Sequence, residues 1–356
     1  MNTQRQQFPV NIIASRMRHH AQASGYDRLA DYLDGDIIYP ITEWRFHQRA
    51  IARAGNYFIS HSGSQWYHRD SFLCELSAAR KWFHGGGQVF HFLYGENLYR
   101  YLGNMKSLGI RNAIVCTYHT PAEKFNQIIT DKKPIKRLDA VITVSSVQQE
   151  IFADIIAHER VHFIPHGIDI EFFRPSEYSS RGDVCKCLCV GSHLRDFDVL
   201  ASAAQALQGK NIEFTVVTST AHYGKFAGLD NVKLLSGIDD NHLLSIYQSS
   251  DIFVMPVTDC TANNALLEAM ACGLPVIATD LTGIRDYVDG SFAILTRQGV
   301  SRSLADGIEY LSGDDSRRKE MALSSRKHAL SFAWEKIAEQ ITRLYRGLGV
   351  HGKHAA

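Results

Sequence analysis

Short apolar runs alternate along the chain with longer stretches that have helical spacing. In the first half, runs that are apolar on both faces predict strands of a covered parallel sheet at residues 9–14, 56–60, 88–94, 113–117, 140–144 and 161–165. A second series lies at 185–190, 213–218, 232–235, 252–256, 275–279 and 293–295. Strands that alternate with helices predict an α/β fold of two doubly wound, Rossmann-like units.

The polar stretch Arg174 to Asp183 (RPSEYSSRGD) separates the two series and is typical of a linker. A chain of 356 residues is also longer than one typical domain. We therefore expect a first domain over residues 1–173 and a second that begins at 174. The net charge of +1 gives no sign of a nucleic-acid partner.

Targeting signals are weak in this sequence. No apolar run reaches the roughly 18 residues needed to span a bilayer. The first residues, MNTQRQQFPVNII, have no long apolar core of the kind found in a secretory signal. We expect a cytoplasmic protein without a transmembrane segment, and weak peripheral contact with a membrane stays open.

Several familiar ligand motifs are absent from the sequence. It contains neither G-x-G-x-x-G nor G-x-x-x-x-G-K-[ST], which argues against a dehydrogenase and a P-loop NTPase. Cys185, Cys187 and Cys189 alternate along one predicted strand, without the second pair of a zinc site. We interpret them as small buried hydrophobic residues.

The most informative stretch runs from Ser250 to Tyr287. A strand at 252–255 ends at Pro256, a polar loop follows, and a helix is predicted from about Asn264 to Cys272. Capping residues stand at its start, and a helix N-terminus in a cleft suits a diphosphate. Glu268, one turn inside, could accept hydrogen bonds from ribose hydroxyls. An ordinary βαβ unit with a surface glutamate is the alternative.

This stretch resembles the donor-binding signature of the retaining glycosyltransferase family 4 (glycosyl transferases group 1), which has the GT-B fold. The match is carried by residues 268–279 (EAMACGLPVIAT), and the runs 138–146 and 163–175 resemble further motifs of the family. Residues 332–345 (FAWEKIAEQITRLY) resemble its C-terminal helix, which crosses back to the first domain. The resemblance thus implies a second domain over 174–335 and a crossover helix and tail over 336–356.

The resemblance implies a nucleoside diphosphate sugar as donor substrate, with UDP favoured over GDP, and no cofactor. The positions that it assigns to the donor are Gly191, Ser192, Arg195, Gly237, Ile238, Asp259, Cys260, Thr261, Ala262, Asn263, Asn264 and Glu268. Two departures stand out. Cys260 replaces the family's acid, with Asp259 beside it, and Ser192 replaces an arginine, while Arg195 takes the place of a lysine.

The first half supplies candidates for catalysis and for the acceptor. His119 follows the strand at 113–117, and the family has a histidine there beside the donor sugar, so we expect a catalytic role for it together with Arg195 and Glu268. A structural histidine is the alternative. Acceptor contacts are expected from Arg16, His19, His20, Gly25, His91 and Glu96, although the basic residues of the first loop could equally be a solvated surface.

Asp196 and Asp198 form a D-x-D, which binds metal in another glycosyltransferase fold. Asp196 stands where a helix should begin, so we interpret it as a helix-start residue and expect no metal.

The resulting expectation is an EC 2.4 hexosyltransferase that acts with retention and without metal in polysaccharide or glycoconjugate biosynthesis. Its acceptor would be a glycan, a lipid-linked sugar or a small molecule. The alternatives are a GT-B sugar-nucleotide epimerase and a non-catalytic nucleotide- or sugar-binding protein.

Overall fold

The computed structural model describes residues 8–14, 23–39, 48–176 and 182–350. The chain divides into two units. Unit 1 comprises residues 1–19, 26–165 and 337–356, and unit 2 comprises residues 20–25 and 166–336.

Unit 1 is built on a six-stranded parallel sheet in the order β2-β1-β3-β4-β5-β6. Its strands are β1 Val10–Ile13, β2 Asp36–Ile38, β3 Val89–Phe92, β4 Ala113–Tyr118, β5 Ala140–Thr143 and β6 Val161–Phe163. Its helices are α1 Gln48–Ser60, α2 Arg69–Trp82, α3 Gly95–Leu98, α4 Ala122–Ile128 and α5 Gln149–Ala153. Most of α12, Trp334–Gly347, also belongs to this unit.

Unit 2 has its own six-stranded parallel sheet, in the order β12-β11-β10-β7-β8-β9. Its strands are β7 Cys185–Val190, β8 Ile212–Val217, β9 Val232–Leu235, β10 Ile252–Met255, β11 Val276–Thr279 and β12 Ala293–Thr296. Its helices are α6 Phe197–Ala206, α7 Asp240–Ser249, α8 Asn264–Ala271, α9 Thr282–Arg285, α10 Ser301–Ser312 and α11 Asp315–Ala329.

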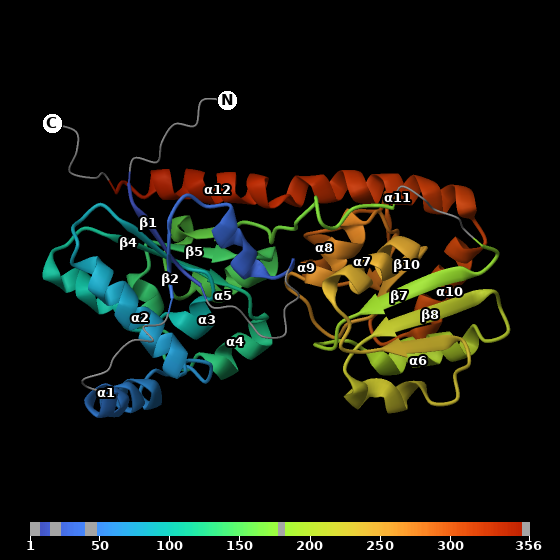
Figure 1. Ribbon diagram of the computed structural model, residues 1–356, viewed down its shortest axis with the longest axis horizontal. Helices are drawn as coiled ribbons and strands as arrows, with labels where there is room; N and C mark the ends of the chain where they lie inside the picture. Colours follow the sequence, from blue (N-terminus) through green and yellow to red (C-terminus); the bar gives the residue numbers. More distant parts are fainter. Residues whose placement is uncertain (1–7, 15–22, 40–47, 177–181, 351–356) are drawn as a thin grey trace. The chain divides into compact units, whose positions relative to one another are not determined.

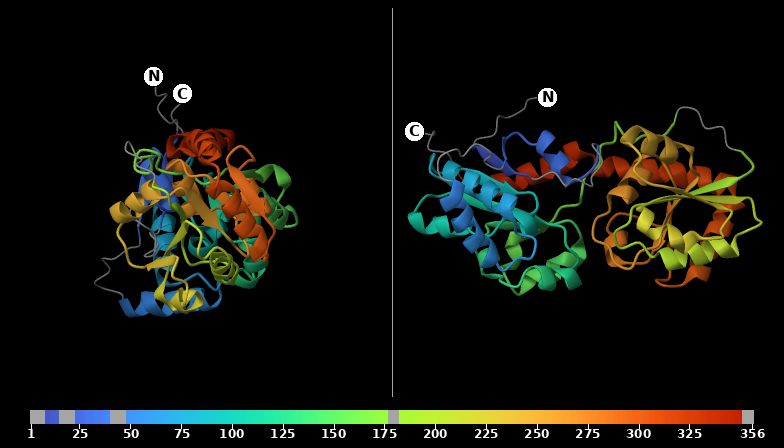
Figure 2. Two further views of the ribbon diagram at one scale, coloured as in Figure 1. Left: turned by 90° about the vertical axis from the view of Figure 1, so that its right-hand side faces the viewer. Right: turned by 60° about the horizontal axis from the view of Figure 1, so that its bottom comes forward.

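Helices pack on both sides of the unit 2 sheet, where α6 lies beside α10 and α8 lies beside α11 (Figure 1, Figure 2). The core strands β10 and β11 are buried along their whole length, as expected for strands covered on both faces. Short 3₁₀ helices complete the chain at Tyr26–Asp31, Leu102–Leu108, Lys133–Arg137, Ser146–Gln148, His158–Arg160, Thr220–Phe226 and Leu330–Phe332.

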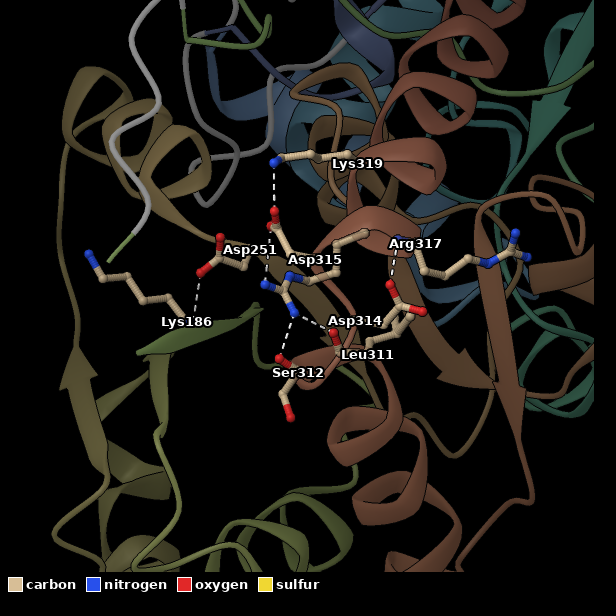
Figure 3. Close-up of polar contacts among 9 residues, drawn as sticks. Lys186, Asp251, Leu311, Ser312, Asp314, Asp315, Arg317 and Lys319 are labelled. Carbon is tan, nitrogen blue, oxygen red and sulfur yellow. Dashed lines mark hydrogen bonds and ion pairs between the residues drawn. The ribbon is translucent and has the colours of Figure 1, made fainter. Parts of the chain in front are cut away.

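A buried arginine joins α10 to α11. The Arg318 guanidinium donates to the carbonyl oxygens of Leu311 (2.5 Å) and Ser312 (2.7 Å) and pairs with Asp315 (Figure 3). These carbonyls close the last turn of α10, where a helix has acceptors without internal partners. Arg318 therefore fixes the corner between the two helices.

The prediction of a strand at 56–60 (NYFIS) is wrong, because these residues form the last turns of α1. Asn56 and Tyr57 are exposed, whereas a central strand would bury both faces. The preceding residues carry the helix up to Ser60, and Phe58 stacks on Phe72 of α2 with ring centroids 5.6 Å apart. A short run with an apolar and aromatic centre (Tyr57 to Ile59) fits either a strand or a helix, and the contact of Phe58 with Phe72 favours the helix.

The cysteine interpretation is confirmed. Cys185, Cys187 and Cys189 are buried in β7, and all seven cysteines of the chain are buried and outside any disulfide bond. Among the described residues, no helix is long and apolar enough to cross a membrane.

Candidate functional site

The clearest site of unit 2 lies at the reversal of its strand order. The chain leaves the sheet in opposite directions from β7 and β10, which are neighbours, and ligands of doubly wound sheets bind beyond the carboxyl ends of such strands. The loops that follow the two strands are joined by backbone hydrogen bonds. The Asp196 N–H donates to Pro256 O (2.9 Å) and the Thr258 N–H donates to Leu194 O (3.0 Å).

Arg195 lies at the centre of these joined loops and is 9% exposed. Its Nε and Nη2 donate to Val190 O at 2.9 and 2.7 Å, and Nη2 also donates to Asn263 Oδ1 at 3.1 Å. Nη1 makes a longer contact of 3.4 Å with His193 O. A guanidinium has five N–H groups. The protein therefore holds the cation in place, and a bidentate phosphate contact would require it to give up one of these bonds.

The turn after β7 fits closely around this arginine. Gly191 has a φ of +103°, and a Cβ there would lie 3.0 Å from Arg195 Nη2. Ser192 Oγ lies 2.9 Å from Thr218 Oγ1 and accepts from the Ser219 N–H. The serine at the family's arginine position thus ties the ends of β7 and β8 together.

Asn263 both begins α8 and contacts Arg195. Its Oδ1 accepts from the Leu266 N–H at 3.3 Å, so the prediction of a cap at this helix start is confirmed. The N-terminal end of α8, with Asn264 half-buried in its first turn, therefore lies beside the guanidinium. Both carry positive potential, which favours an anion at this point.

Glu268 lies one turn further along α8 and is 4% exposed. Its Oε1 accepts from Ser24 Oγ at 2.5 Å, and its Oε2 accepts from the Tyr247 hydroxyl at 2.8 Å. Burial, followed by the neighbouring Glu268 carboxylate, raises the pKa of Tyr247 well above its ordinary value, so the phenol stays a donor. Glu268 is therefore a buried carboxylate that binds hydroxyl groups, not a surface glutamate.

The loop before α8 is packed tightly. Asp259 Oδ1 accepts from the Cys260 N–H at 2.7 Å, while Cys260 and Thr261 are buried and Ala262 is half-buried. Burial raises the pKa of the Cys260 thiol to about 12, so the thiol is neutral near pH 7. This cysteine therefore does not supply the negative charge that the family's acid carries.

Gly237 and Ile238 follow β9, at the outer edge of the sheet. Gly237 is exposed with a φ of +64°, and Ile238 is half-buried. In the sheet order β7 and β8 separate β9 from β10, so these two residues lie further from Asn263 than the turn after β7 does.

In unit 1, His119 follows β4 and is enclosed by two tyrosine rings. The ring centroid of Tyr26 is 4.5 Å away and that of Tyr94 is 4.9 Å away. His119 Nε2 lies 2.8 Å from Leu93 O. Because a carbonyl only accepts, Nε2 carries the hydrogen, and a neutral ring then has its acceptor at Nδ1.

Glu96 supports the backbone at His119. Its Oε1 accepts from the His119 N–H (3.0 Å) and from Thr120 Oγ1 (3.1 Å). Burial raises the pKa of the Glu96 carboxyl to about 7. A side chain that is 2% exposed and bonded in this way holds the loop after β4.

His91 is fully buried inside unit 1. Its Nδ1 lies 2.6 Å from the Tyr345 hydroxyl, and its Nε2 lies 2.8 Å from Thr117 Oγ1. Burial, with a smaller contribution from His119, lowers the pKa of His91 to about 3. Its observed partners give it a packing role that connects β3, β4 and α12.

Of the expected acceptor residues in the first loop, Arg16, His19 and His20 lie outside the described residues, and Gly25 is buried with a φ of +106°. The helix-start interpretation of Asp196 is confirmed, since its side chain accepts from the Val199 N–H. Within the described ranges, no group of three or more His, Cys, Asp or Glu side chains could hold a metal ion.

Sequence reasoning missed three residues of the unit 2 site: Ser24, Tyr247 and Gly283. A Cβ at Gly283 would lie 2.0 Å from the Cys260 carbonyl oxygen, so this glycine allows α9 to pack under the loop. The run 280–287 carries no local signal for that contact, and Ser24 is 244 residues from its partner.

The comparisons with known proteins agree with this architecture. Residues 185–314 match the model of the family glycosyl transferases group 1. The D-inositol 3-phosphate glycosyltransferase of Stackebrandtia nassauensis is 26% identical over 266 residues, which is 66% of this chain and 60% of that protein. The enzyme of the same name from Corynebacterium urealyticum is 35% identical over 118 residues, which is 33% of this chain and 28% of that protein. This chain thus spans less than two thirds of these relatives.

Solved structures show the same fold. Sucrose-phosphate synthase from Thermosynechococcus elongatus superposes with a TM-score of 0.68 at 18% identity, over 96% of this chain and 99% of that one. Anabaena Alr3699/HepE, in complex with UDP and glucose, superposes with a TM-score of 0.68 at 16% sequence identity, over 95% of this chain and 99% of that chain. The chain is therefore a GT-B fold protein that resembles the glycosyl transferases group 1 family, and its second unit carries the part that matches that family's model.

Proposed function

We propose that this chain is a glycosyltransferase that moves a hexose-type sugar from a nucleoside diphosphate sugar to a hydroxyl of a glycan, glycolipid or small-molecule acceptor. The observation that carries the proposal is the joined arrangement of Arg195, Asn263 and Glu268 at the strand-order reversal of unit 2. A cation, a helix N-terminus and a hydroxyl-binding carboxylate follow one another there. A nucleoside diphosphate presents anionic oxygens and ribose hydroxyls in the same order.

In this proposal unit 2 binds the donor. Glu268 accepts hydrogen bonds from the ribose. Arg195 and the first turn of α8 stabilise the charge that develops on the leaving diphosphate, because both are fixed before the reaction and need no reorganisation. The phosphates of the donor lie against the backbone of Gly191 and Ser192 and against the loop 259–264. Gly237 and Ile238 complete the donor set on the base side.

The donor sugar is recognised without the family's acid. Burial keeps the Cys260 thiol neutral, so Asp259 and the loop backbone take over contacts with sugar hydroxyls. UDP complexes of a structural neighbour support a nucleotide donor, and we propose UDP in preference to GDP.

The N-terminal half of the chain binds the acceptor in this proposal, with a catalytic role for His119 and with Glu96 holding the loop of His119. Gly25 and the basic residues Arg16, His19 and His20 contact the acceptor. The reaction proceeds with retention, in which the leaving phosphate takes the proton of the acceptor hydroxyl, and without metal. The chain acts in the cytoplasm.

Glu268→Gln tests the proposal, because it keeps the size of the side chain and removes the charge that ribose hydroxyls need. Calorimetric titration with UDP, GDP and ADP should show a loss of affinity of about tenfold or more for the preferred nucleotide. Glu309→Gln, which makes the same change at an exposed carboxylate of α10, is the matched control and should leave the affinity unchanged. Equal affinity of wild type and Glu268→Gln would remove Glu268 from the site.

Product analysis separates the alternatives. Transfer to an acceptor is expected, with the anomeric configuration retained by NMR and with full activity in EDTA. Conversion of the donor without an acceptor would identify an epimerase, and binding without release of the nucleoside diphosphate would identify a non-catalytic protein.

A further inference from the structure

Positive side chains gather around a hollow at one edge of the unit 1 sheet, which we call the amino-edge pocket. Its volume is about 590 Å³, within the range of small-molecule pockets. It is lined by four cations, which are Lys106, Lys136, Arg137 and Arg160, and Asp139 is the one acid among the described residues that line it. The formal charge of the pocket is therefore +3, although the whole chain carries only +1.

The pocket lies at the amino ends of the strands. Lys106 comes from the 3₁₀ helix before β4, the 3₁₀ helix at Lys133–Arg137 precedes β5, and Arg160 directly precedes β6. His119, in contrast, follows β4 at its carboxyl end. Because all strands of this sheet are parallel, the pocket and His119 lie at opposite edges, separated by about the length of the six-residue strand β4, roughly 20 Å.

The acid of the pocket is already bonded to other groups of the protein. Asp139 Oδ2 accepts from Lys106 Nζ at 2.6 Å and from the Ile114 N–H at 2.7 Å. The other three cations have no acidic partner among the described residues, and the contact of Arg160 Nη1 with Leu138 O is long, at 3.4 Å. Three positive charges around one hollow repel one another, and a bound anion would remove that repulsion.

A glycine holds one of these cations against the backbone. A Cβ at Gly103 would lie 2.9 Å from Arg137 Cβ and 3.2 Å from Arg137 Cδ, so the stem of the arginine lies close against the 3₁₀ helix at Leu102–Leu108. Arg137 as a whole remains exposed, so an anion from solvent can reach it. A side chain that is held before binding loses less conformational entropy when the ligand arrives.

The neighbouring hollow shows that the excess of positive charge is local. This second hollow, of about 860 Å³, lies between β6 and α12 and shares two charged residues with the amino-edge pocket. Its charged lining residues are two acids and two arginines, namely Asp139, Glu159, Arg160 and Arg343. Acids and bases balance there, whereas the amino-edge pocket has three more cations than acids.

We propose that the amino-edge pocket is a second anion site of this chain and binds a ligand with phosphate groups. Arginine binds phosphate oxygens in pairs and lysine adds compact charges, so a ligand with more than one phosphate charge matches the lining. A free phosphorylated compound and the phosphorylated headgroup of a lipid present the same oxygens. The site is separate from the donor site proposed for unit 2, and the proposed reaction does not depend on it.

Inorganic tripolyphosphate tests this inference, because it presents phosphate groups and nothing else. Calorimetric titration in salt of about 0.15 M, which screens loose attraction to surface charges, should show binding to the wild type. The double variant Lys136→Gln, Arg137→Gln should bind about tenfold more weakly or worse. The control Arg53→Gln, Arg69→Gln removes two exposed arginines of α1 and α2 and should bind like the wild type.

Hydrogen exchange locates the bound anion. Tripolyphosphate should slow the exchange of backbone amides in Leu102–Leu108 and Lys133–Arg137 of the wild type, and this effect should be lost in the double variant. Equal affinity of the double variant and the wild type would overturn the inference. Slower exchange that is confined to α8 and the loops around Arg195 would also overturn it, because the anion would then bind only at the donor site.

Vesicles identify the source of the phosphate groups. Sedimentation with phosphatidylcholine vesicles, with and without phosphatidic acid, compares the wild type with the double variant. If phosphatidic acid vesicles bind the wild type but not the double variant, the pocket takes a lipid headgroup. If tripolyphosphate binds in the pocket and these vesicles do not, the pocket takes a free phosphorylated compound.

Discussion

Gly283 lies directly under the loop that carries Cys260, and replacing it tests how closely that loop is placed. A Cβ at residue 283 would lie 2.0 Å from the Cys260 carbonyl oxygen and 3.1 Å from the Thr261 Cα. Ordinary van der Waals contact begins at 3.4 Å, so Gly283→Ala forces α9 and the loop about 1.4 Å apart. The atoms concerned belong to the backbone and cannot rotate away.

The expected cost follows from two opposing contributions. Overpacking costs about 1–3 kcal/mol, while alanine in a helix gains about 0.5–1 kcal/mol over glycine. The free energy of unfolding in urea should therefore fall by about 1–2 kcal/mol. Turnover should fall further, by about a hundredfold, because a displacement near 1 Å of a group that positions substrate has an effect of this size.

Gly307→Ala is the matched control. Gly307 is also a helical glycine of unit 2, and its added Cβ would lie 3.5 Å from methyl groups of Ile277 and Ile294. This variant should be as stable as the wild type or more so, with unchanged turnover. If Gly283→Ala matches Gly307→Ala in both measurements, the close approach of α9 does not fix the loop and the steric argument is wrong.

Two further predictions concern stability. Burial lowers the pKa of His91 to about 3 in the folded chain, whereas the pKa of an unfolded histidine is about 6.5. As the pH falls below about 6.5, only the unfolded chain binds a proton at His91, so the folded state becomes less stable. The free energy of unfolding in urea should therefore fall by about 1.2 kcal/mol more in the wild type than in His91→Gln between pH 6 and pH 5, and equal falls in the two proteins would contradict a buried, neutral His91. Arg318→Met removes two hydrogen bonds to the end of α10 and should cost about 2 kcal/mol or more, whereas the neighbouring Arg317→Met, at an exposed side chain, should cost about 0.5 kcal/mol or less.

The strand, loop and helix around Asn263 could be predicted from sequence because their signals are local. The strand at 252–255 is apolar throughout, an asparagine stands where the helix needs a cap, and Gly273 follows the end of that helix. Each signal acts within a few residues. The D-x-D was interpreted correctly for the same reason, since Asp196 caps the helix that immediately follows it.

The prediction for residues 56–60 failed because the conformation of this segment depends on a packing partner in another helix. Aromatic and β-branched residues fit a strand as well as the end of an amphipathic helix. What decides is the stacking of Phe58 on Phe72, and the sequence contains no record of that contact.

The chemistry of Glu268 shows the same limit at the site itself. Its position one turn inside α8 followed from helix geometry, and its role followed from resemblance. Its two carboxylate oxygens accept hydrogen bonds from Ser24 and Tyr247 only because residues 23–25 and α7 pack against α8. Serine and tyrosine hydroxyls occur throughout the chain, and only the fold selects these two. Both hydroxyl donors are buried, so they hold the carboxylate in one orientation before any ligand binds, and a sequence pattern that places Glu268 on the helix contains no signal for that orientation.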